Sequence, residues 1–362
     1  MKLLTVVGAR PQFIKAAMLN RAVRARADIS EVLVHTGQHH DTKMSDVFFD
    51  QLDIHPPHHS LGVAGGSHGD MTGRMMIALD PVLQTEKPDL VVVYGDTNST
   101  LSAALCAAKF GIPIAHIEAG LRSFNRAMPE EINRVLTDHL SSHLFCPTES
   151  AVENLRNEGI TRRVENVGDI MYDAALHYGN HPAGISRLSP TLRLLQESGG
   201  YILATIHRQE NTDHPNRLER IVGALLNVAD VYPIVLPLHP RTQHRLDEQS
   251  LKRLQSHPSI FVTDPLGYLE MLQLERRAQL VVTDSGGVQK EAFFFRVACA
   301  TLRDQTEWTE LVDHGWNTLI DVSREQIVDR ILNCYGRAGE AGFSPYGDGR
   351  TAERILSSLI SG

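Results

Sequence analysis

A regular alternation of short apolar runs with amphipathic stretches constrains the fold of this chain more than any other feature. In the first half, the apolar runs occupy residues 2–8, 31–35, 90–95, 112–118 and 143–147. Stretches with helical spacing of apolar residues separate them, at 11–26, 69–86, 97–110 and 130–142. Because buried parallel strands need helices on both faces of their sheet, this alternation predicts a doubly wound parallel α/β fold.

A second series of apolar runs follows, at residues 201–207, 232–239, 260–266, 280–286 and 297–303. Between the two series, residues 179–199 are richer in Gly, Pro and Ser and have weaker periodicity, so we place a hinge near 170–195. A chain of 362 residues is also long for a single core. We therefore expect two domains of this kind, at 1–175 and 190–349.

Composition and charge exclude several classes of protein. The formal net charge is −8 and there is no long basic block, which argues against a nucleic-acid-binding surface. No apolar stretch approaches the length of a membrane span, and the N-terminal LLTVVGAR predicts a first strand rather than a signal peptide, so we expect no membrane partner. The four cysteines lack CxxC spacing, which predicts reduced thiols and a cytoplasmic protein.

Polar side chains follow the predicted strands of the first half, where ligands bind in doubly wound sheets. Arg10 and Lys15 lie near the start of the helix after the first strand, and a guanidinium at a helix N-terminus suits a diphosphate. Three carboxylates, those of Asp96, Glu118 and Glu130, come at or after later strand ends. The alternatives are a capped helix with solvated charges for Arg10 and Lys15, and an ordinary helix cap for Asp96.

The segment LVVTDSGGVQKEAFFF, residues 280–295, predicts a strand, a glycine turn and a helix. It lacks both GxxxxGK[ST] and GxGxxG. The turn formed by Ser285, Gly286 and Gly287 could still expose backbone N–H groups to a phosphate. Glu291, one turn into the helix, could accept both hydroxyls of a ribose, and Lys290 is expected to be a charge on the solvent side of the helix.

Two further strand ends of the second half carry histidines. His207 and Arg208 follow the run at 201–207, and His239 ends the run at 232–239. Each half thus has one helix-terminus phosphate site, and carboxylates accompany the first. This combination predicts proton transfer beside a nucleoside diphosphate.

A metal-dependent reaction is the alternative suggested by two histidine-rich segments. GQHHD at 37–41 and HPPHHS at 55–60 could supply ligands together with Asp96 and Glu118, but their spacings match no common site. The glycine-rich segment at 62–70 follows a Pro/His loop instead of a strand, so it fails as a dinucleotide fingerprint. We expect neither a metal nor another cofactor.

Taken in order and spacing, a set of motifs resembles the non-hydrolysing UDP-N-acetylglucosamine 2-epimerase family over essentially the whole chain. The motifs are GARPQFIK, TGQHH, YGDTNST, HIEAGLRS, MPEE, NVGD, HRQEN, LHPR, TDSGGVQKEA and RDQTEW. The resemblance implies a glycosyltransferase-B-like fold of two Rossmann-like domains, with the active site in the interdomain cleft and a C-terminal helix, 350–362, joining the first domain. It also implies a homodimer that makes precursors for surface polysaccharide.

The resemblance implies inversion at C2 of a UDP-2-acetamido sugar by anti-elimination of UDP and its re-addition to a 2-acetamidoglucal. The family's acid/base carboxylates fall on Asp96, Glu118 and Glu130, and its phosphate-contacting histidine falls on His207. Residues implied to bind UDP are Arg10, Lys15, Tyr268, Ser285, Gly286, Gly287 and Glu291. A second, activating substrate site is implied by Gln38, Arg74, Glu131, Arg208 and His239, although Asp41 stands where a glutamine is usual.

Two departures from the common pattern bear on the substrate. RDQTEWTE at 303–310 has Trp308 in place of a UDP-contacting arginine and Thr309 in place of a proline, and the segment before MPEE is short. Both features resemble the branch of the family that acts on UDP-2,3-diacetamido-2,3-dideoxy-glucuronate. That sugar has a C6 carboxylate, and Arg126 is our candidate for a contact to it. Plain UDP-N-acetylglucosamine, a retaining glycosyltransferase reaction, hydrolysis and a catalytically silent sensor are the alternatives.

Overall fold

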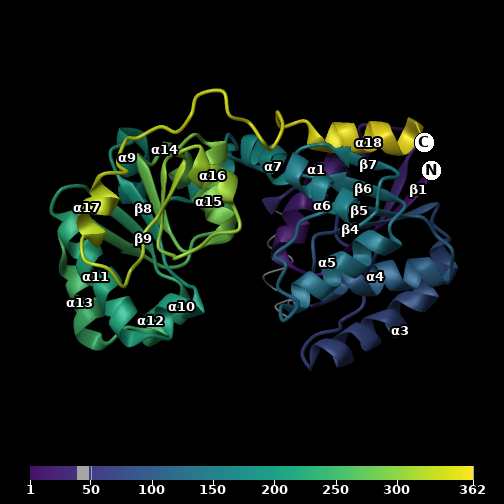
Figure 1. The fold of residues 1–362 in the computed structure, drawn as a ribbon, viewed down its shortest axis with the longest axis horizontal. Helices are drawn as coiled ribbons and strands as arrows, with labels where there is room; N and C mark the ends of the chain where they lie inside the picture. Colours follow the sequence, from purple (N-terminus) through teal and green to yellow (C-terminus); the bar gives the residue numbers. More distant parts are fainter. Residues whose placement is uncertain (39–48, 50, 362) are drawn as a thin grey trace. The chain divides into compact units, whose positions relative to one another are not determined.

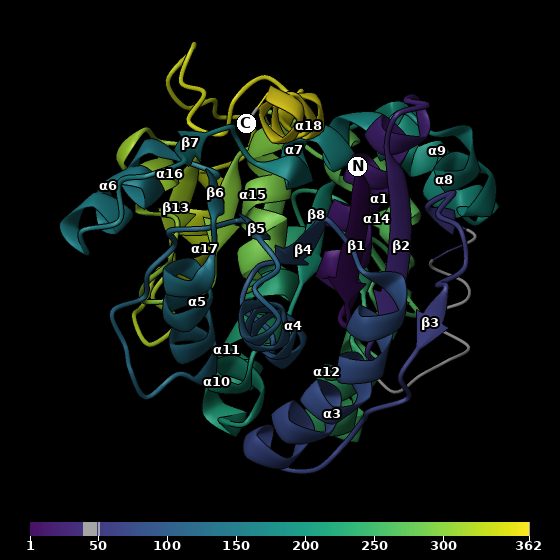
Figure 2. The same ribbon diagram turned by 90° about the vertical axis from the view of Figure 1, so that its right-hand side faces the viewer.

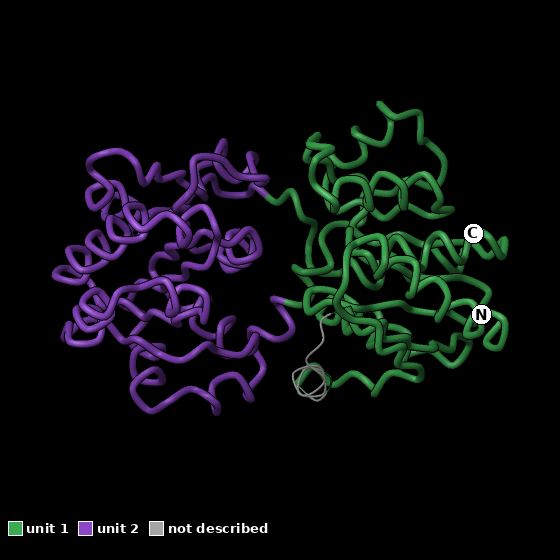
Figure 3. The backbone as a smooth tube through the Cα atoms, turned by 90° about the horizontal axis from the view of Figure 1, so that it is seen from below, with its two compact units in different colours: residues 1–174, 344–362 green, residues 175–343 purple. Residues whose placement is uncertain are grey.

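The structure is a computed structural model that describes residues 1–38, 49 and 51–361 (Figure 1). The chain divides into two compact units, shown in different colours in Figure 3. Unit 1 comprises residues 1–174 and 344–362, and unit 2 comprises residues 175–343. Each unit contains its own parallel sheet, so the predicted doubly wound α/β fold is confirmed.

Unit 1 is built on a seven-stranded sheet with the order β3-β2-β1-β4-β5-β6-β7, in which every neighbouring pair is parallel. The strands are β1 (Lys2–Val7), β2 (Ser30–His35), β3 (His59–Ser60), β4 (Leu90–Tyr94), β5 (Ile114–Ile117), β6 (His143–Cys146) and β7 (Val164–Asn166). The direction of winding reverses between β1 and β4. Such a switch point is where doubly wound sheets bind their ligands, beyond the carboxyl ends of the strands.

The helices of unit 1 cover both faces of this sheet. They are α1 (Arg10–Arg24), α3 (His68–Glu86), α4 (Asn98–Lys109), α5 (Pro129–Leu140), α6 (Glu149–Asn157), α7 (Ile170–Tyr178, which runs into unit 2) and α18 (Thr351–Ser361). Helix α18 packs on α1, and its first residues meet α7 (Figure 2). The Asp173 carboxylate on α7 accepts the backbone N–H groups of Thr351 and Ala352, at 3.0 and 2.8 Å, and so caps α18.

Unit 2 contains a six-stranded parallel sheet with the order β10-β9-β8-β11-β12-β13. The strands are β8 (Ile202–Thr205), β9 (Ile234–Pro237), β10 (Ile260–Thr263), β11 (Leu280–Thr283), β12 (Cys299–Thr301) and β13 (Asn317–Leu319). The helices are α8 (Pro182–Arg187), α9 (Pro190–Ser198), α10 (Gln209–Thr212), α11 (Pro215–Ala229), α12 (Pro240–Arg245), α13 (Glu248–Ser256), α14 (Tyr268–Arg277), α15 (Gly286–Phe294), α16 (Thr309–Asp313) and α17 (Ile327–Leu332). Its switch point lies between β8 and β11.

Alternate residues of the unit 2 strands enter different cores. Ile202 and Ala204 of β8 belong to one buried apolar cluster, whereas Tyr201 and Leu203 belong to another. A strand whose successive side chains are all buried must be covered on both faces. This explains why the sequence shows continuous apolar runs rather than alternation of apolar and polar residues.

Three strands were not predicted from the sequence: β3, β7 and β13. Each has only two or three residues and lies at an edge of its sheet. An edge strand needs no long apolar run, because fewer of its side chains are enclosed. The segment predicted as a hinge, 170–195, folds mainly into α7, α8 and the start of α9.

A fully buried glutamate, Glu275 on α14, makes the stability of unit 2 depend on pH. Neither of its carboxyl oxygens has a hydrogen-bond partner among the described residues. Burial raises the pKa of Glu275 well above its ordinary value, and the nearby Glu291 carboxylate raises it further. The folded protein therefore keeps a proton on Glu275 that the unfolded chain loses near pH 4.5.

We predict that Glu275→Gln changes the unfolding free energy differently at two pH values. The difference between the variant and the wild type should favour the variant more at pH 8 than at pH 4.5. The wild type loses about 1.4 kcal/mol of unfolding free energy for each pH unit between the unfolded and folded pKa values of Glu275, whereas glutamine does not titrate. Denaturant unfolding at the two pH values measures the difference. Glu219→Gln, an exposed change on α11, is the control; equal pH dependence in all three proteins would contradict the prediction.

Candidate functional site

The turn after β1 is fixed by a buried glutamine. The side-chain oxygen of Gln12 accepts the N–H groups of Gly8 and Ala9, at 2.8 and 3.1 Å, and its amide nitrogen donates to the carbonyl of Tyr94, at 2.8 Å. Gln12 thereby joins the ends of the two strands that flank the switch point of unit 1. A Cβ at Gly8 would collide with the hydroxyl of Ser99, so only glycine fits there.

Glu118 directly follows β5 and has a left-handed backbone, with φ +74°. Its carboxylate forms an ion pair with the buried Lys15 of α1. A Cβ on Gly95, the residue after β4, would lie 3.0 Å from Glu118 Oε2, so glycine permits this close approach. The structure thus brings together Lys15 and Glu118, two of the residues proposed from the sequence, beside the turn that carries Asp96.

Asp96 is held from α5. The guanidinium of Arg134 forms an ion pair with its carboxylate, and the side chain of Asn133 donates to its main-chain carbonyl at 2.9 Å. Burial raises the pKa of Asp96; the Glu118 carboxylate raises it further, while Arg134 and Lys15 oppose the change. A carboxyl whose pKa is raised toward neutrality is suited to give and take protons.

Glu130, the third carboxylate, is in the first turn of α5 and is exposed. Its neighbour Glu131 is buried and accepts hydrogen bonds from the N–H and hydroxyl of Ser123, both at 2.9 Å, and from the N–H of Phe124. Burial disfavours charge on Glu131, but these bonds and Arg134 hold its pKa below the ordinary value. In this structure Glu131 anchors the loop before α5.

The switch point of unit 2 depends on Asp284, which is fully buried at the end of β11. Its carboxylate accepts the N–H groups of His207 and Arg208 and the side-chain amide of Asn211, each at about 3.0 Å. These bonds join the end of β8 to the end of β11. Sequence reasoning named the neighbouring Ser285 but missed Asp284, although an acid directly after a buried strand was the signal used for Asp96.

His207 has its Nδ1 atom 3.4 Å from Asp284 Oδ1. Burial lowers the pKa of His207; Asp284 opposes this change, and Arg208 and Arg241 add to it. The His239 ring lies 5.2 Å from the His207 ring, centroid to centroid, and its Nδ1 accepts the N–H of Arg241 at the start of α12. Two histidines and two arginines therefore gather near the ends of β8 and β9.

The Ser285–Gly287 turn begins α15, as the sequence predicted. Ser285 is the N-terminal capping residue, and its side chain makes no cap hydrogen bond. Gly286 would place a Cβ 3.5 Å from Arg208 Nη2, so a guanidinium lies close to the start of the helix. Backbone N–H groups at a helix N-terminus beside a cation form a natural phosphate site. Glu291 is buried one turn further along α15.

Lys290 was predicted to be a solvent-side charge, and this is wrong. Its side chain is buried, with Nζ 4.3 Å from the centroid of the Trp308 ring. Trp308 Nε1 donates to the carbonyl of Gly286 at 2.9 Å. Trp308, which stands where the family's common pattern has an arginine, therefore packs directly against the glycine turn.

The remaining predicted site residues occupy separate places. Tyr268 is buried at the start of α14, with its ring 6.3 Å from that of Tyr178. Gln38 accepts the N–H of Ser99 at 3.0 Å, and Arg74 binds Asp70 and the main chain of the preceding loop. Asp41 and the histidines of GQHHD lie outside the described residues.

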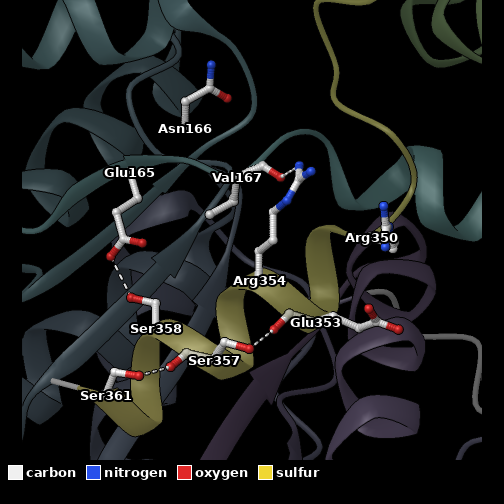
Figure 4. Close-up of a pocket in the computed structure, with 9 residues that line it drawn as sticks. All are labelled: Glu165, Asn166, Val167, Arg350, Glu353, Arg354, Ser357, Ser358 and Ser361. Atoms are coloured by element: carbon white, nitrogen blue, oxygen red, sulfur yellow. Dashed lines mark hydrogen bonds between the residues drawn. The ribbon is translucent and has the colours of Figure 1, made fainter.

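Among the described residues, no group of three or more His, Cys, Asp or Glu side chains could hold a metal ion. A surface hollow of about 850 Å³ lies between β7 and α18, lined among others by Glu165, Arg354 and Ser358 (Figure 4). The Glu165 carboxylate accepts the Ser358 hydroxyl at 2.5 Å. None of the predicted site residues lines this hollow.

Two doubly wound units, one with paired acids and one with a glycine turn at a helix N-terminus, define an enzyme of nucleotide-linked sugars. The chain belongs to the UDP-N-acetylglucosamine 2-epimerase family, whose sequence model matches residues 21–360, and it is an isomerase. The resemblance drawn from the motifs is thereby confirmed. Among the helices that the structure describes, none has both the length and the hydropathy to cross a membrane.

Individual relatives cover the whole chain. It is 51% identical to the UDP-2,3-diacetamido-2,3-dideoxy-D-glucuronate 2-epimerase of Pseudomonas aeruginosa, over 99% of both chains. The crystal structure of the Methanocaldococcus jannaschii UDP-GlcNAc 2-epimerase with UDP-GlcNAc and UDP is 42% identical and matches with a TM-score of 0.83, over 100% of both chains. The Neisseria meningitidis enzyme bound to UDP-GlcNAc is 30% identical, with a TM-score of 0.86 over 100% of both chains.

We predict that Gly95→Ala greatly lowers 2-epimerase turnover, whereas Gly111→Ala does not. Both glycines have left-handed backbones, with φ +60° and +67°, so each alanine costs about 1–2 kcal/mol of stability. Only a Cβ at position 95 would meet Glu118; a Cβ at position 111 would have no atom within 4 Å. Thermal unfolding and turnover measurements separate the two effects. Equal turnover in the two variants would show that the contact with Glu118 is unimportant.

Proposed function

We propose that this enzyme inverts C2 of a UDP-2-acetamido sugar by eliminating and re-adding UDP. The observation that carries the proposal is the pairing of Lys15 with Glu118 beside Asp96 at the switch point of unit 1. The C2 hydrogen is not next to a carbonyl, so simple deprotonation would be prohibitively uphill. Elimination avoids this barrier, because the C2–H and C1–O bonds break as the C1=C2 double bond forms and UDP leaves with the electron pair.

The two acids have different surroundings, which supports different roles. The ammonium group of Lys15 pairs with Glu118, whereas Asp96 pairs with Arg134 and burial raises its pKa. In our proposal, Glu118 takes the C2 proton from one face and Asp96 delivers a proton to the opposite face of the 2-acetamidoglucal, with the roles exchanged in the reverse direction. Glu130, exposed at the start of α5, is the third proposed acid/base residue.

Unit 2 offers groups that match a nucleoside diphosphate. In our proposal, the Ser285–Gly287 turn and Arg208 bind the phosphates, His207 contacts the leaving diphosphate, and Glu291 accepts the ribose hydroxyls. The helix N-terminus of α15 and the nearby guanidinium support the phosphate contacts. Arg10, at the first residue of α1, is the proposed diphosphate contact from unit 1. No metal or organic cofactor is needed by this route.

Within the family, we propose UDP-2,3-diacetamido-2,3-dideoxy-D-glucuronate as the substrate. Support comes from the 51% identity to the Pseudomonas aeruginosa enzyme and from Trp308, which contacts the glycine turn where the common pattern has an arginine. Arg126, in the loop before α5, remains our candidate for the C6 carboxylate. UDP-N-acetylglucosamine is the second candidate, because the 42%-identical Methanocaldococcus jannaschii relative carries its name.

We predict that the enzyme exchanges the C2 hydrogen of the diacetamido-glucuronate with solvent deuterium and produces the C2 epimer, faster than with UDP-N-acetylglucosamine. Proton NMR in deuterated water follows both reactions. The reverse order of rates would overturn the substrate assignment. Absence of exchange with either sugar would overturn the epimerase proposal, and transfer to an acceptor or accumulation of free UDP would identify a transferase or hydrolase instead.

We predict that Glu118→Gln lowers the exchange rate by at least about 100-fold, because a general base contributes that much or more. UDP affinity should stay within a few-fold of the wild type, since the proposed UDP contacts lie mainly in unit 2. The matched control is Glu153→Gln, an exposed change on α6 of the same unit. Preserved exchange in Glu118→Gln would remove Glu118 from the mechanism.

We also propose that the enzyme is a cytoplasmic homodimer that supplies precursors for surface polysaccharide. The support for a dimer is the family resemblance together with a row of exposed apolar side chains spaced four residues apart, Met128 just before α5 and Ile132 and Leu136 within it. The cytoplasmic assignment is supported by four free, buried cysteines. Light scattering coupled to size-exclusion chromatography measures the mass of the particle.

A further inference from the structure

Asp138, in the last turn of α5, is a fully buried carboxylate that none of the proposed catalytic roles uses. It accepts a hydrogen bond from the N–H of Gly120 at 3.1 Å and one from Arg122 Nη1 at 2.7 Å, and its Oδ1 atom lies 2.6 Å from His116 Nδ1. Burial works against charge on Asp138, but His116 and Arg122 hold its pKa below the ordinary value. An ionised, buried carboxylate with three donors is a strong anchor for the groups that surround it.

His116 extends this anchor to the neighbouring strand. Its Nε2 atom lies 2.8 Å from the carbonyl oxygen of Gly95, and its Nδ1 atom faces Asp138. The two ring nitrogens thus lie against an acceptor on each side, the Gly95 carbonyl and the Asp138 carboxylate. The ring therefore ties the turn that contains Gly95 and Asp96 to α5.

The bonds to Asp138 bracket Glu118 on both sides. His116 lies two residues before it, and Gly120 and Arg122 lie two and four residues after it. Glu118 itself is left-handed, a conformation that a residue with a side chain adopts only when its surroundings hold it. Fixing the chain before and after Glu118 provides that restraint.

The preceding turn of α5 holds the second acid. Asn133 donates to the Asp96 carbonyl, and Arg134 pairs with its carboxylate. Helix α5 therefore binds both strand-end turns, through Asp138 at its C-terminal end and through residues 133 and 134 one turn earlier. A single rigid element sets the relative placement of Asp96 and Glu118.

We propose that Asp138 is a positioning residue of the epimerase, which keeps Glu118 in its reactive conformation and, through His116 and Gly95, aligns the turn that carries Asp96. This inference rests on the proposed function, because it concerns where the two acid/base groups lie. The bonds of Asp138 go to neither acid side chain. Asp138 acts by fixing His116, Gly120 and Arg122, which lie before and after Glu118 in the chain. Its effect should therefore fall on the chemical step and leave nucleotide binding intact.

The test compares Asp138→Asn with Asp173→Asn. Both replace a buried carboxylate of unit 1 that accepts backbone N–H groups, but Asp173 caps α18 and contacts neither acid-bearing turn. We expect Asp138→Asn to lower kcat for C2 deuterium exchange at least tenfold. The amide nitrogen of asparagine cannot accept a hydrogen bond, so at least one of the three bonds to residue 138 is lost. The Kd for UDP should remain within twofold of the wild type. Asp173→Asn should lower Tm while keeping kcat within twofold.

Each outcome bears on the inference. If Asp138→Asn does not fold, His116→Gln provides the same test, since it leaves the bonds of Asp138 to Gly120 and Arg122 in place. A kcat within twofold of wild type in either folded variant overturns the proposal, and so does failure of both variants to fold, which would make the network purely structural. If the wild type shows no C2 exchange, the proposed function fails. If the wild type exchanges the C2 hydrogen and the variant does so with the same kcat, the positioning role alone fails.

Discussion

The ends of the central strands in each sheet depend on one buried side chain that bridges them. Gln12 joins the turns after β1 and β4, and Asp284 joins the turns after β8 and β11. At a switch point the chain leaves neighbouring strands in opposite directions, so the backbone N–H groups of the turns lack partners in the sheet. A buried N–H group without an acceptor is costly, and these two side chains supply the acceptors.

The turns that are bridged in this way carry different chemical groups in the two units. In unit 1, the bridged turns bear Asp96 and lie against Glu118, and a lysine and an arginine neutralise the acids. In unit 2, the bridged turns bear His207 and the start of α15, and the guanidinium groups of Arg208 and Arg241 lie close to them. In our proposal the first unit handles the protons and the second holds the anion, as a reaction that cleaves a diphosphate ester beside a C–H bond requires.

Sequence reasoning reached the fold because a strand buried on both faces leaves a continuous apolar run. It also placed Asp96, Glu118 and the Ser285 turn just past such runs, and the structure has them after β4, β5 and β11; their roles stay predictions. It missed Gln12, Asp138 and Asp284, whose partners lie up to 88 positions away in the chain. Local pattern carries no information about such pairs. Lys290 was misplaced for a related reason: its burial depends on Trp308, which the sequence places 18 residues later.

The indole of Trp308 gives this chain a built-in optical probe. Only two tryptophans are present, and the other, Trp316, is buried against Phe293. Trp308 instead donates its N–H to the residue at the start of α15 and is covered by an ammonium group. The polarity around this ring should change when an anion occupies the glycine turn, so intrinsic fluorescence can report occupancy of the proposed nucleotide site without a label.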